Sequence, residues 1–199
     1  MRSALKSVAK AIALAAMLPC AALTFFGRLE GPYIFLAQFA ALFPGIPGDY
    51  LRAAYYFMTL RSCSLDTRIA FGTYFSKATS SVGSHVSIGA FCVIGRAQIG
   101  SRTQFGPAVQ VLSGARQHVR DAEGRLADGE FAEISIGTDC WIGASAVVMA
   151  DVGSGSTVAA GAIVTSPVPP GTVVAGNPAR ILQTAQTRPK AGWRGKSDA

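Results

Sequence analysis

Two histidines could act as a general base near neutral pH, and they lie in different kinds of segment. His118 stands in residues 112–133, LSGARQHVRDAEGRLADGEFAE, a charged stretch without alternation of apolar and polar residues. An imidazole there could take the proton of a hydroxyl group during a group-transfer reaction. His85 lies inside a regular repeat, and we expect it to face outward. His118 is therefore the candidate catalytic residue, and Asp121 or Glu133 could orient it.

The sequence on both sides of that stretch repeats every six residues. In VGSHVSIGAFCVIG, residues 82–95, an aliphatic residue followed by glycine recurs at positions 82, 88 and 94, and the repeat resumes from Ile136 to Val164. Neither the period of a helix nor that of an ordinary strand explains this spacing. A short fixed period is typical of a solenoid. We predict an all-β fold, a parallel β-helix with three hexads per coil, in which the small residue after each inward-pointing aliphatic residue lets the chain turn the corner without a Cβ clash.

The first 60 residues are far more apolar than the rest. Two uncharged runs, AIALAAMLPCAALTFF (11–26) and PYIFLAQFAALF (32–43), are separated by a GRLEGP turn. Each is short for a bilayer core of about 30 Å, so a hairpin that dips into one leaflet, or one tilted span with an interfacial helix, is expected. A third helix should follow over residues 48–60. A cleavable signal peptide and a hairpin buried on a partner are the alternatives.

Composition divides the chain into three parts. We expect a hydrophobic, helical, membrane-associated segment over 1–66, a β-helix domain over 67–182 that contains the loop 112–133, and a basic flexible tail over 183–199. The four cysteines are too far apart in sequence to suggest a disulfide framework or a zinc site, so they are read as free thiols. The net charge of +7 is spread along the chain without interleaved aromatic residues, which disfavours nucleic acid as a partner.

The repeats, together with IGTDCWIGASAVV (136–148) and AAGAIVTSPVPPGTVVAGNPARIL (159–182), resemble the hexapeptide-repeat acyltransferases. The resemblance covers residues 67–182 and is nearest to the O-acetyltransferases of sugars and polysaccharides. It implies that the coils wind left-handed, whereas the usual rule for parallel crossovers gives the right hand. It also implies a homotrimer with acetyl-CoA in the groove between neighbouring coils, and no metal.

The resemblance also implies roles for particular residues. His118 stands at about the family's distance ahead of the WIG coil and would be the general base, although counting from FGP at 105–107 places the family histidine nearer Arg116. The Ala144 N–H could stabilise an oxyanion, and Arg180 could bind the phosphates of coenzyme A. The residues implied to contact acetyl-CoA are Trp141, Gly143, Ala144, Ala160, Thr165 and Arg180.

These expectations describe an acetyl-CoA-dependent O-acetyltransferase. Its acceptor would be a sugar hydroxyl of a bacterial surface polysaccharide or of a lipid-linked precursor, at the cytoplasmic face of the inner membrane. An N-acyltransferase acting on an amino sugar and a non-enzymatic β-helix scaffold at the membrane are the alternatives. A zinc hydratase of the γ-carbonic anhydrase type is disfavoured, since its site takes three histidines and the chain has two.

Overall fold

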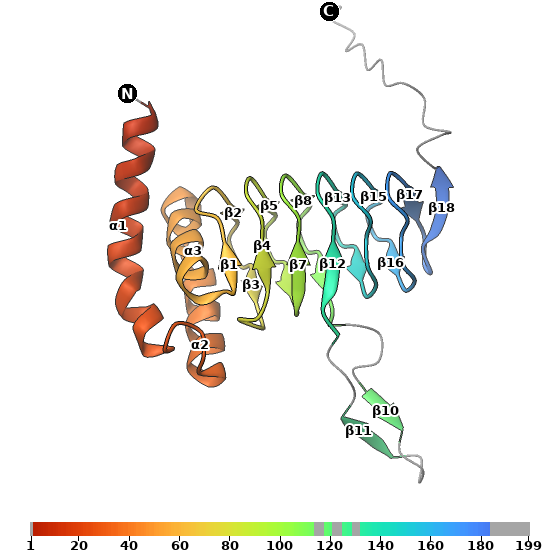
Figure 1. Cartoon of the computed structure of the whole chain (residues 1–199), viewed down its shortest axis with the longest axis horizontal. Helices are drawn as coiled ribbons and strands as arrows, with labels where there is room; N and C mark the ends of the chain where they lie inside the picture. The colour runs from red at the N-terminus through yellow and green to blue at the C-terminus, as the bar shows by residue number, and fades with distance from the viewer. Residues whose placement is uncertain (1, 114–117, 121–124, 129–131, 184–199) are drawn as a thin grey trace, which may run out of the picture.

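Three helices cover the N-terminal end of a solenoid of short strands (Figure 1). The computed structural model describes residues 2–113, 118–120, 125–128 and 132–183. The helices are α1 (Arg2–Leu23), α2 (Glu30–Ala41) and α3 (Gly45–Thr59). The first coil of the solenoid begins at Ser62, a few residues before the boundary expected near Thr67.

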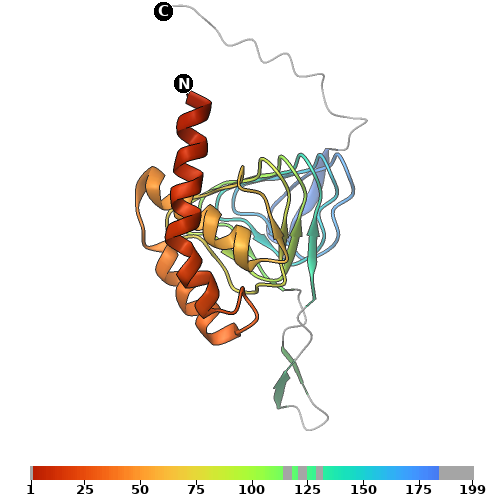
Figure 2. The same cartoon turned by 60° about the vertical axis from the view of Figure 1, so that its left-hand side comes forward.

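The strands form three parallel sheets, which are the three faces of a left-handed β-helix (Figures 1 and 2). Sheet A contains β1 (Ser62–Cys63), β4 (Ser81–Val82), β7 (Ala97–Ile99) and β12 (Ile134–Ile136). Sheet B contains β2 (Arg68–Ile69), β5 (Ser87–Ile88), β8 (Gln104–Phe105), β13 (Trp141–Ile142), β15 (Thr157–Val158), β17 (Val173–Ala175) and the antiparallel β18 (Arg180–Gln183). Sheet C contains β3 (Tyr74–Phe75), β6 (Val93–Ile94), β9 (Gln110–Val111), β14 (Val147–Val148) and β16 (Ile163–Val164).

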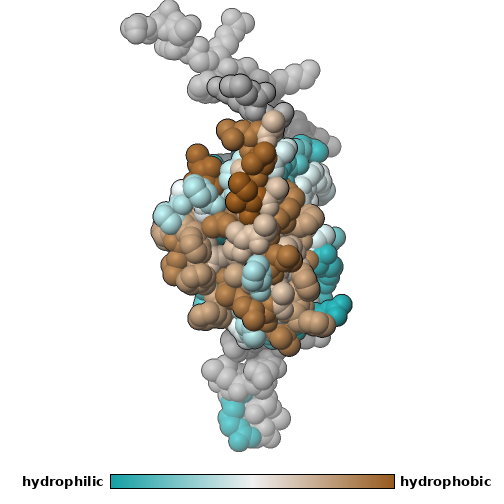
Figure 3. Space-filling model, turned by 90° about the vertical axis from the view of Figure 1, so that its left-hand side faces the viewer, coloured by the Kyte–Doolittle hydropathy of each residue, from teal (hydrophilic) through white to brown (hydrophobic). Residues whose placement is uncertain are grey.

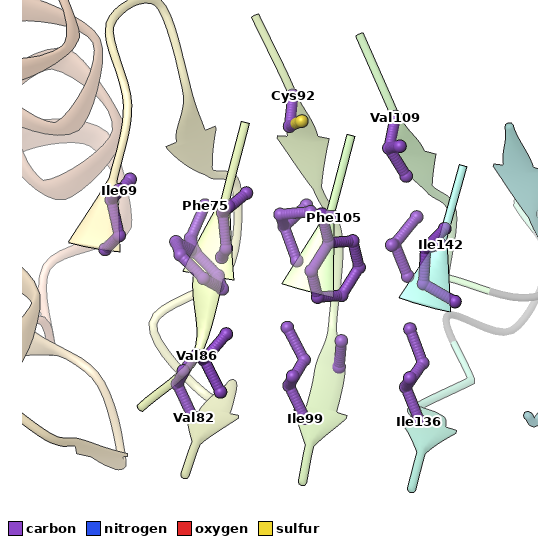
Figure 4. Packing of buried hydrophobic residues seen from close by; sticks show 14 of the residues in the cluster. Ile69, Phe75, Val82, Val86, Cys92, Ile99, Phe105, Val109, Ile136 and Ile142 are labelled. Carbon is purple, nitrogen blue, oxygen red and sulfur yellow. The ribbon is translucent and has the colours of Figure 1, made fainter. Parts of the chain in front are cut away.

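The chain turns at three edges, which we name by the sheets that they join: the A/B, B/C and C/A edges. Between the edges, the aliphatic residues of the hexads stack in register from coil to coil and fill the shaft (Figure 4). Burying each such side chain contributes about 1.5–3 kcal/mol. The predicted β-helix is therefore confirmed down to its register, whose buried columns are Val82–Ile99–Ile136–Val152–Val168, Ile69–Ile88–Phe105–Ile142–Val158–Val174 and Phe75–Ile94–Val111–Val148–Val164.

Glycine follows many of the buried aliphatic residues, and it is needed there for coil stacking. A Cβ on Gly100 would lie 2.5 Å from the carbonyl carbon of Gly137 in the next coil. The residue with a left-handed backbone at each corner lies two positions after this glycine. That residue is often not a glycine itself: φ is 58° at Phe91 and 57° at Ser145. The predicted Cβ clash is thus real, but it is with the neighbouring coil.

The segment 112–133 leaves the C/A edge after β9 and returns to it at β12 (Figure 1). The sequence predicts no strand there, and this prediction is wrong, because the segment contains an antiparallel hairpin of β10 (His118–Arg120) and β11 (Leu126–Asp128). The two strands have three residues each, too few for a two-residue alternation to be recognised.

The helical cap, which we define as α1 to α3 with their connecting turns, is apolar on its inner and outer sides. In α1, Ala13, Met17 and Ala21 are buried, while large apolar residues on other sides of the helix are exposed. Figure 3 shows that the end of the molecule formed by the cap is mostly apolar. By length and composition alone, α1 could cross a membrane from Ala4 to Leu23, and 17% of the tested window is buried. The exposed large apolar residues of the cap are Leu5, Val8, Ile12, Leu18, Leu23, Phe25, Phe26, Leu29, Phe35, Phe39, Leu42, Phe43, Ile46 and Phe57.

Arg52 of α3 joins the cap to the first coil. Its side chain is fully buried, and it donates to the carbonyl oxygens of Ile69 (2.7 Å) and Phe43 (2.6 Å) and to Asp49 Oδ1 (2.8 Å). Burial lowers the pKa of Arg52, and the hydrogen bond to Asp49 opposes that shift. A buried charge is tolerated only when it is paired and hydrogen-bonded in this way.

Candidate active site

Three of the residues implied to bind acetyl-CoA lie together at the B/C edge. The chain passes from β13 to β14 through Gly143 and Ala144, and Ala160 occupies the same corner one coil later. A Cβ on Gly143 would lie 2.4 Å from the Ala160 nitrogen, so glycine lets the two coils approach. The Gly161 N–H donates to the Ala144 oxygen at 2.8 Å, which keeps the corners stacked. The result is a narrow ridge of small side chains along one edge of the solenoid.

Trp141 lies on the outer face of sheet B, just before this edge. It is 46% exposed, while Ile142 beside it is fully buried. In register, Trp141 pairs with Gln104 on one side and Thr157 on the other. Packing into the core therefore does not account for Trp141, and its ring is available to a ligand that lies along sheet B.

The Ala144 N–H is free to donate. Its neighbours are engaged: Gly143 N–H donates to Val158 and Ser145 N–H to Pro107, while within the described residues Ala144 N–H makes no backbone hydrogen bond. The same is true of Ala160 at the corner of the next coil. Both corners of this edge therefore offer a free backbone N–H. Ala144 rather than Ala160 would stabilise an oxyanion only if the reacting carbonyl group lies beside Ala144.

Thr165 and Arg180 lie nearer the C-terminal end of the solenoid. Thr165 is exposed where the chain leaves β16 at the C/A edge, and Arg180 is exposed at the start of β18. Arg180 borders a hollow of about 400 Å³ together with Ser166 and Pro167. Thr165 therefore lies at a different edge from Gly143 and Ala144, whereas Arg180 pairs with Ala175 at the B/C end of sheet B, farther toward the C-terminal end of the solenoid.

The hairpin with His118 stands at the C/A edge, which is a different edge from that of Ala144. The backbone of His118 pairs with Asp128 across the hairpin, and the His118 side chain lies outside the described part of the chain. Arg116 and Asp121 also lie outside the described residues. Within the described part of one chain, the hairpin and the B/C edge are not brought together. His85 is exposed at the A/B edge.

Glu133, one of the two residues considered for orienting the imidazole, is engaged at the base of the loop. Its Oε1 lies 3.1 Å from Arg61 Nη1 and 3.8 Å from Arg96 Nε. This network ties the returning end of the loop to the starts of β1 and β7, the first and third strands of sheet A. Sequence reasoning missed Arg61 and Arg96, although both precede a strand of sheet A just as Glu133 does, and aligning the coils would have shown that shared position.

Three of the four cysteines, Cys63, Cys92 and Cys140, are poorly suited to covalent catalysis. Burial raises the pKa of Cys63 to about 11 and also raises the pKa values of Cys92 and Cys140, so these thiols stay protonated. All four cysteines are free. Among the described residues, no group of three or more His, Cys, Asp or Glu side chains is placed to hold a metal ion.

Comparisons with known proteins identify the repeat and the fold. The family model of the hexapeptide repeat of succinyl-transferase matches residues 133–166, and no curated protein matches the sequence significantly. A maltose O-acetyltransferase from Clostridium difficile 630 is 20% identical with a TM-score of 0.67, over 82% of this chain and 90% of that chain. A galactoside acetyltransferase in complex with coenzyme A is 18% identical with a TM-score of 0.54, over 82% of both chains.

The polySia specific acetyltransferase NeuO is 24% identical with a TM-score of 0.52. That match covers 64% of this chain and 62% of NeuO, so the chain spans less than two thirds of that protein. At these identities the likenesses show the fold, and together with the matched repeat they support the prediction of an acyltransferase. These findings agree with the resemblance seen in the sequence: residues 133–166 match the hexapeptide repeat, and the chain has the β-helical fold of these solved acetyltransferases.

Proposed function

We propose that the protein transfers an acetyl group from acetyl-CoA to a hydroxyl of a sugar in a surface polysaccharide or a lipid-linked precursor. The observation that carries the proposal is the single long interruption of the hexad register in the described solenoid. The interrupting segment leaves the C/A edge after β9 and carries His118 in a hairpin. Solved acetyltransferases of maltose and galactosides share the solenoid, and the galactoside enzyme was solved with coenzyme A.

The proposed chemistry is direct transfer. The imidazole of His118 takes the hydroxyl proton while the acceptor oxygen attacks the thioester carbonyl carbon. The negative charge that develops on the carbonyl oxygen is stabilised by a backbone N–H, for which the free donor of Ala144 is our candidate. The C–S bond then breaks, and the imidazolium returns the proton to the sulfur of coenzyme A. The protonated, buried thiols of this chain agree with a route that forms no acyl-enzyme.

A homotrimer would complete the site. In one chain, the hairpin and the ridge of Gly143, Ala144 and Ala160 occupy different edges of a triangular solenoid. Three copies around a three-fold axis could place the C/A edge of one chain against the B/C edge of the next. Each of the three sites would then combine a hairpin from one subunit with a ridge from its neighbour.

The acceptor can be tested with the purified full-length protein in detergent. Labelled acetyl-CoA is offered with a maltoside, a galactoside, a sialic acid polymer and an amino sugar, and the products are treated with hydroxylamine, which cleaves esters faster than amides. We expect a hydroxylamine-labile product with at least one sugar. A stable amide product would favour an N-acyltransferase, and failure to bind acetyl-CoA would favour a scaffold.

A further inference from the structure

Two residues that each have a buried polar atom without a hydrogen bond line one pocket, although Arg96 Nε also lies 3.8 Å from Glu133 Oε1. In the described part of the chain, only Tyr33 Oη and Arg96 Nε are buried side-chain polar atoms that lack a hydrogen bond. Both residues line the same hollow of about 350 Å³, between the helical cap and the coils. Buried donors without partners are rare in native proteins, and a ligand is one explanation for them. Burial raises the pKa of Tyr33, so its phenol keeps the proton that it could donate.

Basic residues outnumber acidic residues in the lining of the pocket, and Arg96 is also paired with Glu133 outside that lining. Three basic residues line the pocket, Arg28, Lys77 and Arg96, against a single acid, Glu30. Glu30 pairs with Lys77 across the pocket. The guanidinium of Arg28 is exposed and stands 5.1 Å from the ring centre of Phe25. A site with this excess of arginine donors is suited to an anion with several oxygens, and phosphate matches guanidinium geometry.

An apolar turn borders the pocket. Between α1 and α2, Phe25 and Phe26 adopt φ values of 48° and 53°, a left-handed backbone that is unusual for bulky residues. The turn is fixed by Gly27, where a Cβ would lie 2.1 Å from the Thr59 oxygen. The strained turn leaves Phe25 55% and Phe26 51% exposed beside Arg28. Exposed aromatic rings next to arginine are typical of a surface that meets lipid headgroups.

The pocket also lies on the edge that carries the hairpin. Lys77 and Arg96 occupy the C/A edge in the first and second turns of the chain, and the loop leaves that edge one coil later. The Arg96 N–H donates to Ser113 Oγ (2.8 Å) at the start of the loop, and Glu133 at its end lies near Arg96 Nε. A group held in the pocket would therefore sit between the apolar cap and the base of the loop.

We propose that this pocket binds a phosphate group carried by a membrane lipid. The phosphate could belong to a phospholipid headgroup, or it could link a sugar acceptor to its lipid carrier. Only the second source rests on the proposed acetyltransferase, and in that case the pocket would position the acceptor for His118.

Calorimetric titration of the full-length protein in detergent micelles tests the proposal. The probes are a prenyl monophosphate, the matching prenol, a short-chain phosphatidylglycerol and a short-chain phosphatidylcholine. We expect the monophosphate, the phosphatidylglycerol or both to bind at least ten-fold more tightly than the matched prenol or phosphatidylcholine. Stronger binding of the prenyl monophosphate identifies the carrier as the source, and stronger binding of phosphatidylglycerol identifies a headgroup site.

Variants distinguish a specific binding site from non-specific electrostatic attraction to the protein surface. Arg28→Gln and Arg96→Gln should each weaken the preferred probe about ten-fold, because each removes a charged hydrogen bond. Tyr33→Phe leaves the charge of the pocket unchanged, and it should weaken binding of the preferred probe less than the two arginine variants do. Lys6→Gln removes an equal charge from the exposed part of α1, outside the pocket, and should leave binding unchanged. Arg28 is exposed, so its variant should fold, and circular dichroism checks this.

Equal affinities for phosphate-bearing and phosphate-free probes, or equal losses in Arg96→Gln and Lys6→Gln, would overturn the proposal. The titration contains no acetyl-CoA. If the pocket variants lose binding while the protein transfers no acetyl group, the proposed function fails and the lipid-phosphate site stands.

Discussion

The β-helix and the helical cap place their apolar residues differently. Along the coils, the strands of the parallel sheets bury a largely apolar residue and turn a different side chain outward, as in Ser87–Ile88 and Gln110–Val111. In the cap, α2 buries Tyr33 and Ala37 and still exposes Phe35 and Phe39. The inner side of the coils is therefore covered, whereas the cap has an outer side of large apolar residues that the described part of the chain leaves exposed.

This difference indicates two environments for one chain. A large exposed apolar surface marks a site of interaction with a membrane or a protein. A membrane accounts best for the exposed apolar surface of the cap, because its exposed apolar residues lie in and beside uncharged stretches of α1 and α2 and next to a basic pocket. We propose that the cap inserts into one leaflet or spans the membrane at its cytoplasmic face, where the β-helix would meet acetyl-CoA.

The largest expected effect concerns membrane attachment. The intact protein should sediment with membranes and stay there in about 1 M salt, which shortens the Debye length to about 3 Å. Apolar burial of several helices outweighs the roughly 1 kcal/mol that each basic residue contributes at an anionic surface. Detergent should release it. Release by salt alone would show that charge, and not the apolar face, holds the protein.

The joint between the two regions should depend on Arg52. Arg52→Leu leaves the Phe43 and Ile69 carbonyl oxygens without this donor, and we expect a loss of about 3–5 kcal/mol. The midpoint of thermal unfolding in detergent should fall by roughly 10 °C. The matched change Arg102→Gln breaks an exposed ion pair with Asp139 and should leave the midpoint nearly unchanged. Similar midpoints for both variants would show that the cap is attached by its apolar contacts alone.

Replacing a glycine by alanine should destabilise the coils but not the cap. Gly100→Ala forces a Cβ against Gly137 and should lower the free energy of unfolding by about 1–3 kcal/mol. Gly31→Ala in α2 places its Cβ in open space and should be neutral or stabilising by up to about 1 kcal/mol. Thermal unfolding of the two variants measures the contrast. A tolerated alanine at residue 100 would mean that the coils can separate more easily than their stacking indicates.

The strands and register of the coils could be predicted closely, because a spacing between residues that are near in sequence determines them. Val82, Ile88 and Ile94 each mark a strand, and the same six-residue spacing sets which residues pair in the next coil. The step of five residues from Ile94 to Ile99 and the step of four from Val148 to Val152 did not disturb the columns. A repeat of this kind needs no long-range information to fix its fold.

The cap joint, the hairpin and the pocket could not be predicted because their partners are distant in sequence. Arg52 reads as an exposed charge until its acceptors at Phe43 and Ile69 are known. The pocket combines Tyr33 with Arg96, and no spacing relates them. The resemblance supplied roles for Ala144 and Ala160, and the structure adds that they share an edge, which is not the edge of His118.

Steady-state acetyl transfer by three alanine variants tests the central claim most directly. His118→Ala should lower kcat by about 10² to 10⁴-fold and leave folding and acetyl-CoA affinity nearly intact, since it removes only the group that takes the proton. His85→Ala, at the exposed A/B edge, should change little. Arg116→Ala tests the other alignment of the loop, because a guanidinium cannot accept a proton at this pH. Wild-type activity should also fall on acidification, when the imidazole is protonated. Wild-type turnover in His118→Ala would contradict the account.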